Sequence, residues 1–478
     1  MSLGSRSARI HTNPSAGFAR PIVIAAGLCA SVTVAVLATL TIGGPAVILL
    51  LMTAIVIVMG VKKPEVAFVA AITVGVGNGA LRRIAGWIDP SGIATQIVPI
   101  IPAVILVTLY VSLLVIRRNH WTDKAPIAFV LVCIVVIISG INPAGVGIVN
   151  NLLASSLLIS GILAFILTFR RLIPHSSVIN TLAVVGSINA AYMILQEING
   201  LTPWDAYWVD NFGYSALYLG PNLVRPLGLG ASAAESAAIC AMLVGVSVAR
   251  LRVSRNPAWL VPISLGLYAA LTSGTRTFAL PALAVILLGF AIGRKRPMLV
   301  GLVTLAVTLP VIVVIAGRLM PAVSSAGAGR VLMLVSGSES EETSTVGIHQ
   351  DLILSSLLRG LSSVIGTGSG QVSVLASGGL GSSEQDISNM ALIGGVLGVV
   401  AMLALYITFA RAIPGAFRDL NTAPFLFITF ATIGQWMNVG YYGATPLIWA
   451  SLGVVLSLRT KETKEYALDT GRKRSSRD

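Results

Sequence analysis

Long apolar runs separated by short polar segments dominate this sequence. A helix needs about 20 apolar residues to cross about 30 Å of hydrocarbon, and several runs reach or approach that length. The pattern therefore predicts an all-α, polytopic transmembrane bundle of about 12–14 spans. The expected spans lie at 21–42, 45–61, 65–80, 97–116, 126–142, 148–169, 179–196, 232–249, 257–272, 278–293, 298–316, 388–410, 423–438 and 443–458.

Composition supports this class, because 55% of the residues are hydrophobic and 10% are charged. The formal net charge of +14 is also typical of nucleic-acid-binding proteins, but the positions of the basic residues argue against that function. When the predicted spans alternate sides from a cytoplasmic N-terminus, most of the 32 Lys and Arg residues fall at cytoplasmic ends. This is the positive-inside distribution, so both termini are expected in the cytoplasm and no nucleic-acid partner is expected.

The expected domain organisation follows from these spans. Residues 1–20 form a basic cytoplasmic tail, 21–458 a single transmembrane domain, and 459–478 a second basic cytoplasmic tail. Two longer external segments, 197–231 and 317–387, interrupt the spans. The second contains an amphipathic stretch, "IHQDLILSSLLRGL", which either caps the helical bundle or lies on the membrane surface.

The segment "TSGTRT" at 272–277 turns the chain between two apolar arms. Each arm has about 15 apolar residues, or about 22 Å of helix, which is less than the hydrocarbon thickness. The turn, with Arg276, is therefore expected below the outer surface and inside protein. A guanidinium there needs a partner, either a structural carboxylate such as Glu235 or an anionic ligand.

A small group of arginines is expected on the external side, where membrane topology does not require basic residues. Several such arginines suit a diphosphate, because each planar guanidinium donates parallel hydrogen bonds and stays charged. Alternatively, some pair with carboxylates such as Asp205, Asp210 and Glu235, and we prefer this interpretation for Arg82 and Arg83. The other external arginines are Arg225, Arg276, Arg318, Arg330 and Arg359.

Over about residues 179–410 the chain resembles the O-antigen ligase and polymerase superfamily of integral membrane glycosyltransferases. The resemblance is carried by "VRPLGLGASAAESAAICAML", by "LTSGTRTFALPALAVILLGF", and by a later external segment. That segment contains "AGRVLMLVSG", then "HQDLILSSLLRGLSSVIGTGSGQ", and leads into the span "NMALIGGVLGVVAMLALYI". Each motif is degenerate, and their order is the more specific signal.

The resemblance implies transfer of a glycan from a polyprenyl-diphosphate donor to an acceptor hydroxyl outside the cytoplasmic membrane. Arg276, Arg225, Arg330 and Arg318 would bind the diphosphate. Arg359, Asn389 and Glu384 are candidates for contacts with the glycan or the acceptor. Neither a metal nor another cofactor is implied. The expected partners are the lipid-linked donor, the glycan acceptor, the bilayer and proteins of polysaccharide export or chain-length control.

The chain departs from the family pattern at one point. Members commonly have a histidine before the asparagine that opens the late span, and here the region reads "SSEQDISNM". The expected acceptor-activating base is therefore Asp386, with His349 as the second candidate.

Two other functions compete with glycan transfer. The first is a transporter, such as a flippase for lipid-linked oligosaccharides, and the second is a non-catalytic scaffold in an envelope assembly. Within the transferase hypothesis, the sequence does not separate polymerase from ligase.

Overall fold

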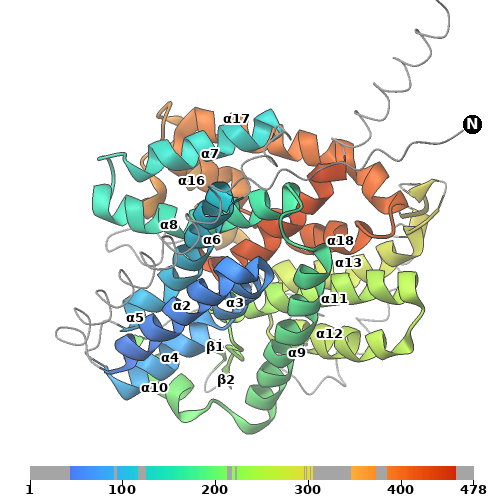
Figure 1. Ribbon diagram of the computed structural model, residues 1–478, viewed down its shortest axis with the longest axis horizontal. Helices are drawn as coiled ribbons and strands as arrows, with labels where there is room; N and C mark the ends of the chain where they lie inside the picture. The colour runs from blue at the N-terminus through green and yellow to red at the C-terminus, as the bar shows by residue number, and fades with distance from the viewer. Residues whose placement is uncertain are drawn as a thin grey trace, which may run out of the picture.

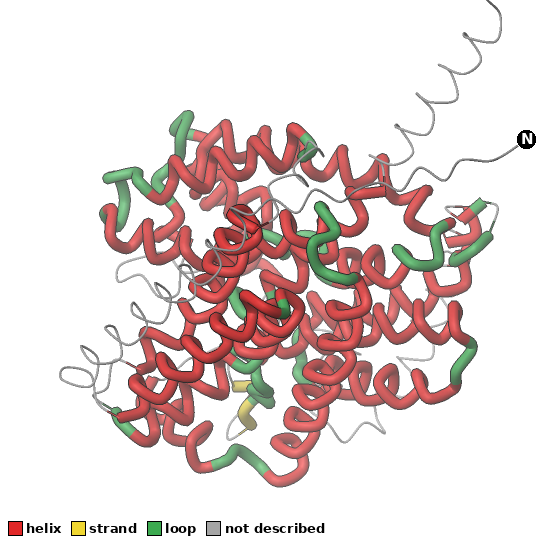
Figure 2. Tube along the Cα trace, in the orientation of Figure 1, coloured by secondary structure: helices red, strands yellow, loops and turns green. Residues whose placement is uncertain are grey.

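The computed structural model describes residues 44–90, 94–116, 125–212, 218–220, 223–294, 296–297, 299–301, 303–304, 346–372 and 385–458. These residues form a bundle of helices, with one short two-stranded hairpin in the described part (Figures 1 and 2). Both predicted tails, 1–20 and 459–478, lie outside the described residues.

The first half of the bundle contains α2 (Gly44–Lys62), α3 (Pro64–Val76), α4 (Asn78–Ile88), α5 (Ala94–Ile97), α6 (Ile101–Ile116), α7 (Ile127–Gly140), α8 (Ile148–Phe169), α9 (His175–Asn199) and α10 (Pro203–Phe212). The second half contains α11 (Ala233–Ser254), α12 (Leu260–Thr272), α13 (Arg276–Leu288), α16 (Val346–Leu361), α17 (Asp386–Arg418), α18 (Ala423–Ala431) and a last helix, Thr445–Leu458. Between the halves, β1 (Tyr218–Gly220) pairs antiparallel with β2 (Leu223–Val224). Short 3₁₀ turns lie at η1 (Val98–Ile100), η4 (Pro257–Trp259), η5 (Gly289–Ala291), η7 (Ser369–Val372) and η8 (Val439–Tyr441).

Five helical stretches in the described ranges are long and apolar enough to cross a membrane. A sixth candidate is the pair α3 and α4, which is bent by 65°. The predicted all-helical membrane class is therefore confirmed, whereas the total of 12–14 spans and the sides of both termini stay predictions. The five stretches are Ala94–Val115, Ile148–Phe169, His175–Asn199, Ala233–Ser254 and Asp386–Arg418.

Two predicted spans are wrong in detail. The run 65–80 is broken at Gly77, because α4 turns away so that Gly79 packs directly against the backbone of Gly230. The run 423–438 is helical only to Ala431 and continues as irregular chain, with Gly434 at a φ of 85°. The span 21–42 and most of 298–316 lie outside the described residues.

The two segments expected as external loops contain regular elements in the ranges that the structure describes. Segment 197–231 contains α10 and the β1–β2 hairpin, and the described part of 317–387 contains α16, η7 and the start of α17. Their side of the membrane stays a prediction.

Helix α11 forms the centre of the bundle, where it packs against α9, α12, α13 and α18 (Figure 1). Its side chains from Glu235 to Ala249 are all buried. Small residues allow this close packing, as where Gly245 lies against the backbone of Phe427 on α18.

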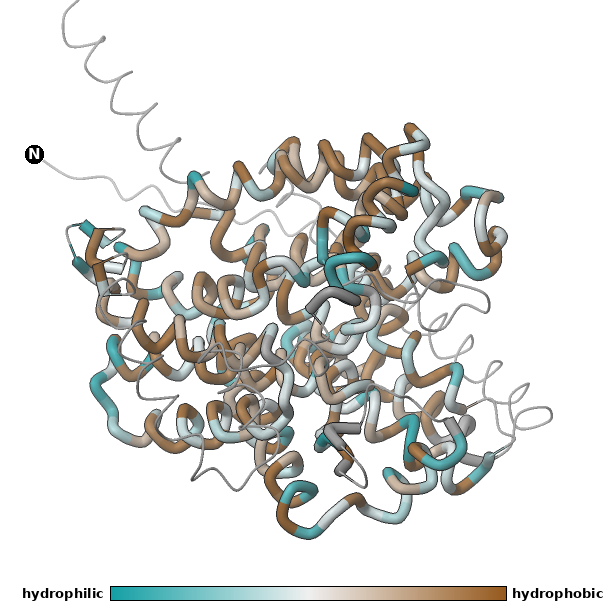
Figure 3. Tube along the Cα trace, turned by 180° about the vertical axis from the view of Figure 1, so that it is seen from behind, coloured by the Kyte–Doolittle hydropathy of each residue, from teal (hydrophilic) through white to brown (hydrophobic). Residues whose placement is uncertain are grey.

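Apolar side chains also cover the outside of the bundle. On α9, Val184, Ile188 and Leu195 are exposed by 60%, 54% and 54%. On α17, Val396, Val400, Leu403 and Ile407 form an exposed stripe. Figure 3 shows apolar residues along most of the helices. A bilayer is the solvent that such surfaces fit.

Helix α17 is interrupted at Gly395, whose φ of 61° and ψ of −144° are not helical. The chain after α16 satisfies the peptide groups that this break frees. Val396 N–H donates to Ser363 O at 3.1 Å, Leu397 N–H donates to Val364 O at 3.2 Å, and Thr367 N–H donates to Leu392 O at 2.8 Å. The break therefore depends on the chain that leaves α16.

We predict that Gly395→Ala lowers the stability of the protein strongly. The added Cβ meets the carbonyl oxygen of Ser363, and the backbone conformation at Gly395 is one that only glycine adopts readily. Gly434→Ala is the matched control, because Gly434 also has positive φ but open space around it, so it should cost only about 1–2 kcal/mol. Thermal denaturation of both variants in detergent would test this, and equal midpoints would contradict it.

Candidate functional site

The predicted turn around Arg276 is a tight helical hairpin. Helix α12 ends at Thr272, Gly274 takes a φ of 64°, and α13 begins at Arg276. The Ser273 hydroxyl accepts a hydrogen bond from Thr275 N–H at 3.1 Å. Thr272, Ser273 and Thr275 are buried, with exposed fractions of 1%, 0% and 8%. The expectation that this turn lies inside protein is confirmed.

The backbone of Arg276 is the first residue of α13, but its side chain lies outside the described part of the structure. Whether Glu235 or an anion pairs with it is therefore not tested. The neighbouring hydroxyl of Thr275 is buried and has no hydrogen-bond partner among the described residues, although Thr275 stands at the N-cap of α13.

The start of α13 lies against the segment 432–444, which we call the 432–444 connection because it joins α18 to the last helix. The rings of Phe278 and Tyr441 pack edge to face, with centroids 5.5 Å apart. Trp436, Asn438 and Tyr442 in this connection are buried. Irregular chain of this kind is stable at membrane depth only when protein surrounds it.

Glu235 ties the start of α11 to the same connection. Its Oε1 accepts hydrogen bonds from Gly443 N–H at 2.7 Å and Ala444 N–H at 2.9 Å. Its Oε2 accepts from Ala231 N–H at 2.6 Å, while the Ser232 hydroxyl caps α11 by accepting from Glu235 N–H. The carboxylate is thus compensated by backbone donors and by a helix N-terminus.

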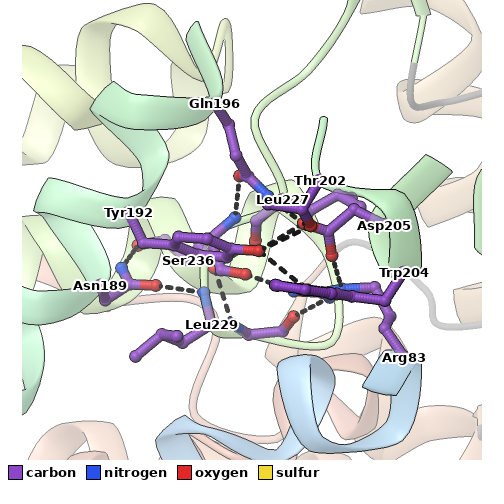
Figure 4. A network of polar contacts seen from close by, with 12 residues as sticks. Arg83, Asn189, Tyr192, Gln196, Thr202, Trp204, Asp205, Leu227, Leu229 and Ser236 are labelled. Carbon is purple, nitrogen blue, oxygen red and sulfur yellow. Dashed lines mark hydrogen bonds and ion pairs between the residues drawn. The ribbon is translucent and has the colours of Figure 1, made fainter. Parts of the chain in front are cut away.

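Arg83 and Asp205 form a buried ion pair between α4 and α10 (Figure 4). Arg83 Nε donates to Asp205 Oδ1 at 2.5 Å, Nη1 donates to Gly230 O at 2.8 Å, and Nη2 donates to Gly228 O. The side chains are 1% and 0% exposed. The preferred interpretation of Arg83, pairing with a carboxylate, is confirmed.

The other oxygen of Asp205 collects donors from α9 and from the turn before α10. Asp205 Oδ2 accepts from Tyr192 OH at 2.5 Å, Gln196 Nε2 at 2.6 Å and Thr202 Oγ1 at 2.6 Å. The same helix α9 also holds residues 228 and 229, because Gln196 Oε1 accepts from Gly228 N–H and Asn189 Oδ1 from Leu229 N–H, both at 2.8 Å (Figure 4). Side chains of α4 and α9 therefore hold residues 228–230, which follow Arg225.

Arg82 differs from its neighbour Arg83 because it does not pair with a carboxylate, so the prediction made for Arg82 is wrong. Its Nη1 donates to Tyr442 OH at 2.8 Å and its Nε donates to Thr95 O at 3.0 Å. The guanidinium also lies over the ring of Trp208, 5.2 Å from the centroid. Asp205 already pairs with Arg83, and Arg82 binds these groups instead. Through its hydrogen bond to Tyr442, Arg82 also links α4 to the 432–444 connection.

Asp386, the first candidate base, is the first residue of α17 and is fully buried. Its Oδ1 accepts from Met437 N–H and its Oδ2 from Tyr406 OH, both at 2.6 Å. Asn389 is also buried, and its Nδ2 donates to Met437 O at 3.3 Å. The structure thus brings Asp386 and Asn389 together at the 432–444 connection.

The remaining candidates are distributed differently. His349 is half-buried and Arg359 is exposed, and both lie on α16, which packs against α17. Arg225 is half-buried between β2 and the fixed residues 228–230. Arg318, Arg330 and Glu384 lie outside the described residues.

Sequence reasoning missed the polar face of α9. Asn189, Tyr192 and Gln196 lie on one side of an apolar span, at the helical spacing of three and four residues. That spacing was the available signal, since polar residues inside a span turn toward protein partners. Among the described residues, no three His, Cys, Asp or Glu side chains gather as a metal-binding set.

Compared with protein-family models, curated proteins and solved structures, the chain matches none of them.

We predict that Asp205→Asn lowers the free energy of unfolding by about 3–5 kcal/mol, because it leaves the buried Arg83 cation without its counter-ion. Asp210→Asn on the same helix is the control, since Asp210 is exposed and should change little. Unfolding of both variants in detergent measures the difference. A loss for Asp205→Asn no larger than for Asp210→Asn would show that the ion pair contributes nothing.

Proposed function

We propose that this chain is a membrane glycosyltransferase that polymerises or ligates polyprenyl-diphosphate-linked oligosaccharides on the external face of the cytoplasmic membrane. It would act in the synthesis of a surface or secreted polysaccharide. The proposal rests on the family resemblance and on one structural observation, the buried start of α13.

The start of α13 has the properties of an anion site. A helix N-terminus carries unpaired N–H groups and a partial positive charge, and here it lies inside protein, where such charge acts strongly. Thr272, Ser273 and Thr275 surround it with small polar groups, and the Thr275 hydroxyl is available as a further donor. An arginine in the first turn adds a permanent cation. A diphosphate suits this combination better than a neutral solute.

In the proposed reaction, the acceptor hydroxyl oxygen attacks the anomeric carbon of the donor glycan. The bond from that carbon to the phosphate oxygen breaks, and the diphosphate leaves on its lipid. Arg276, Arg225, Arg330 and Arg318 would stabilise the negative charge that develops on the leaving group. Arg225 is suited to this role because the residues that follow it are held by Arg83 and α9.

The acceptor proton would pass to a carboxylate or an imidazole. Asp386 is our first candidate and His349 our second. Asp386 lies beside the 432–444 connection, which also contacts the start of α13 through Tyr441. Its two hydrogen bonds would have to loosen when the acceptor binds. Arg359, Asn389 and Glu384 stay candidates for glycan or acceptor contacts.

A transporter of lipid-linked oligosaccharides is the second candidate function, and a specific observation favours it. The α3–α4 pair is bent and α17 is broken at Gly395, and broken helices frequently form transport sites in membrane carriers. However, the chain after α16 hydrogen-bonds the peptide groups at the break in α17. This favours a fixed structural role for the break over a substrate site.

We expect Arg276→Lys to reduce glycan transfer about 100-fold, because lysine keeps the charge but loses the two-pronged donor geometry. The measurement is polymer or ligated product formed by purified protein from a lipid-diphosphate donor. Arg294→Lys, at the exposed far end of the same hairpin, is the control and should keep full activity. Near-normal product with Arg276→Lys at normal protein level would refute the role of Arg276.

Asp386→Asn should also reduce transfer about 100-fold if Asp386 is the base, because the amide cannot accept the proton. Tyr406→Phe is the matched control, since it removes one hydrogen bond to Asp386 and keeps the carboxylate. Both variants need equal thermal stability for the comparison. Full activity of Asp386→Asn, together with loss in His349→Ala, would assign the base to His349 instead.

A further inference from the structure

Helix α16 presents three distinct sectors around its axis. At 100° per residue, the first sector contains Ser356 and Gly360. The second sector contains Leu354, Leu358 and Leu361. The third sector contains Asp351, Ser355, Arg359 and Ser362. The first sector is buried, and the other two are exposed. The two exposed sectors lie side by side and differ in polarity, with the exposed Leu352 at the far edge of the polar sector and the exposed Gln350 at the far edge of the leucine sector.

The buried sector fixes α16 to α17. Gly360 lies so close to the backbone of Ala391 that no larger residue would fit, and Ser356 is 6% exposed. Helix α16 packs along α17 (Figure 1). The orientation of the two exposed sectors is therefore set by the bundle.

The apolar sector is large for a surface in contact with water. Leu354, Leu358 and Leu361 are exposed by 55%, 62% and 41%. The sector continues past the end of the helix in Val364 and Ile365, at 64% and 45%.

This apolar sector is continuous with the exposed stripe of α17. Val364 O accepts a hydrogen bond from Leu397 N–H at 3.2 Å, so the two surfaces meet there. Leu397 is itself exposed, and the stripe runs on through Val400, Leu403 and Ile407. The helix after Gly395 extends from 396 to 418, or about 34 Å at 1.5 Å per residue, and Arg411 and Arg418 lie in its last two turns.

We propose that α16 lies along the boundary of the bilayer, with its leucine sector in the acyl chains and its polar sector among headgroups and water. A helix half apolar and half polar on its exposed side fits such a boundary, because each half meets its own solvent. Arg359 in the polar sector complements anionic headgroups. The inference depends on the membrane class of the protein and not on its proposed activity.

The test compares adjacent residues at almost the same height along the helix. Leu354→Cys and Ser355→Cys differ by 100° around the axis, and both positions are exposed. Each is made in a background with Cys29, Cys133 and Cys240 replaced by alanine, labelled with a small fluorophore, and reconstituted in phosphatidylethanolamine–phosphatidylglycerol vesicles. Leu403→Cys on α17 provides the lipid-facing reference.

We expect brominated phospholipid to quench the label at 354 severalfold more than the label at 355, and iodide in the water to show the opposite order. Strong iodide quenching at both positions would overturn the proposal, because α16 would then cap the bundle in water. Protection of position 354 from both quenchers would also overturn it, in favour of a protein or a second copy covering the leucines. If either variant fails to fold, Leu361→Cys and Ser362→Cys, which are also adjacent and both exposed, serve as the second pair.

Discussion

A peptide group freed inside an apolar bundle must find a hydrogen-bond partner, and this requirement governs the architecture of the chain. The described helices break or end inside protein at Gly77, Gly274, Gly395 and along the 432–444 connection. At Gly395 the partners come from the chain after α16. At Gly443 and Ala444 they come from the carboxylate of Glu235. The irregular segments therefore stabilise one another and hold the bundle together around α11.

The buried charged side chains serve the same requirement. Arg83 donates to two backbone carbonyls as well as to Asp205, and Asp386 accepts from Met437 N–H. Each charge fixes a loop beside a helix end. As a result, the starts of α11, α13 and α17 all meet the 432–444 connection. The starts of α11 and α17 already carry the buried carboxylates of Glu235 and Asp386, so the start of α13, with Arg276, is the one that the proposed diphosphate site uses.

Hydropathy alone predicted most of the helices, because a span must bury a long apolar run whatever its neighbours are. It did not predict the bend at Gly77 or the end of α18 at Ala431, which depend on where distant chain segments pack. The buried turn before Arg276 could be predicted because each of its two apolar arms has only about 15 residues, or about 22 Å of helix. The partners of Arg82 and Arg83 are less accessible to sequence reasoning, since Asp205 can neutralise only one of two adjacent arginines. Which of them reaches it depends on the rotation of α4.

The central proposal is that the chain consumes lipid-linked glycans outside the cytoplasm. Mass spectrometry of the lipid-linked glycans in a strain lacking this chain tests it most directly. We expect the lipid-linked donor to accumulate in this strain. Single repeat units on the lipid carrier would identify a polymerase, and long chains on the carrier would identify a ligase. An unchanged pool of lipid-linked glycans, with normal surface polysaccharide, would contradict the account.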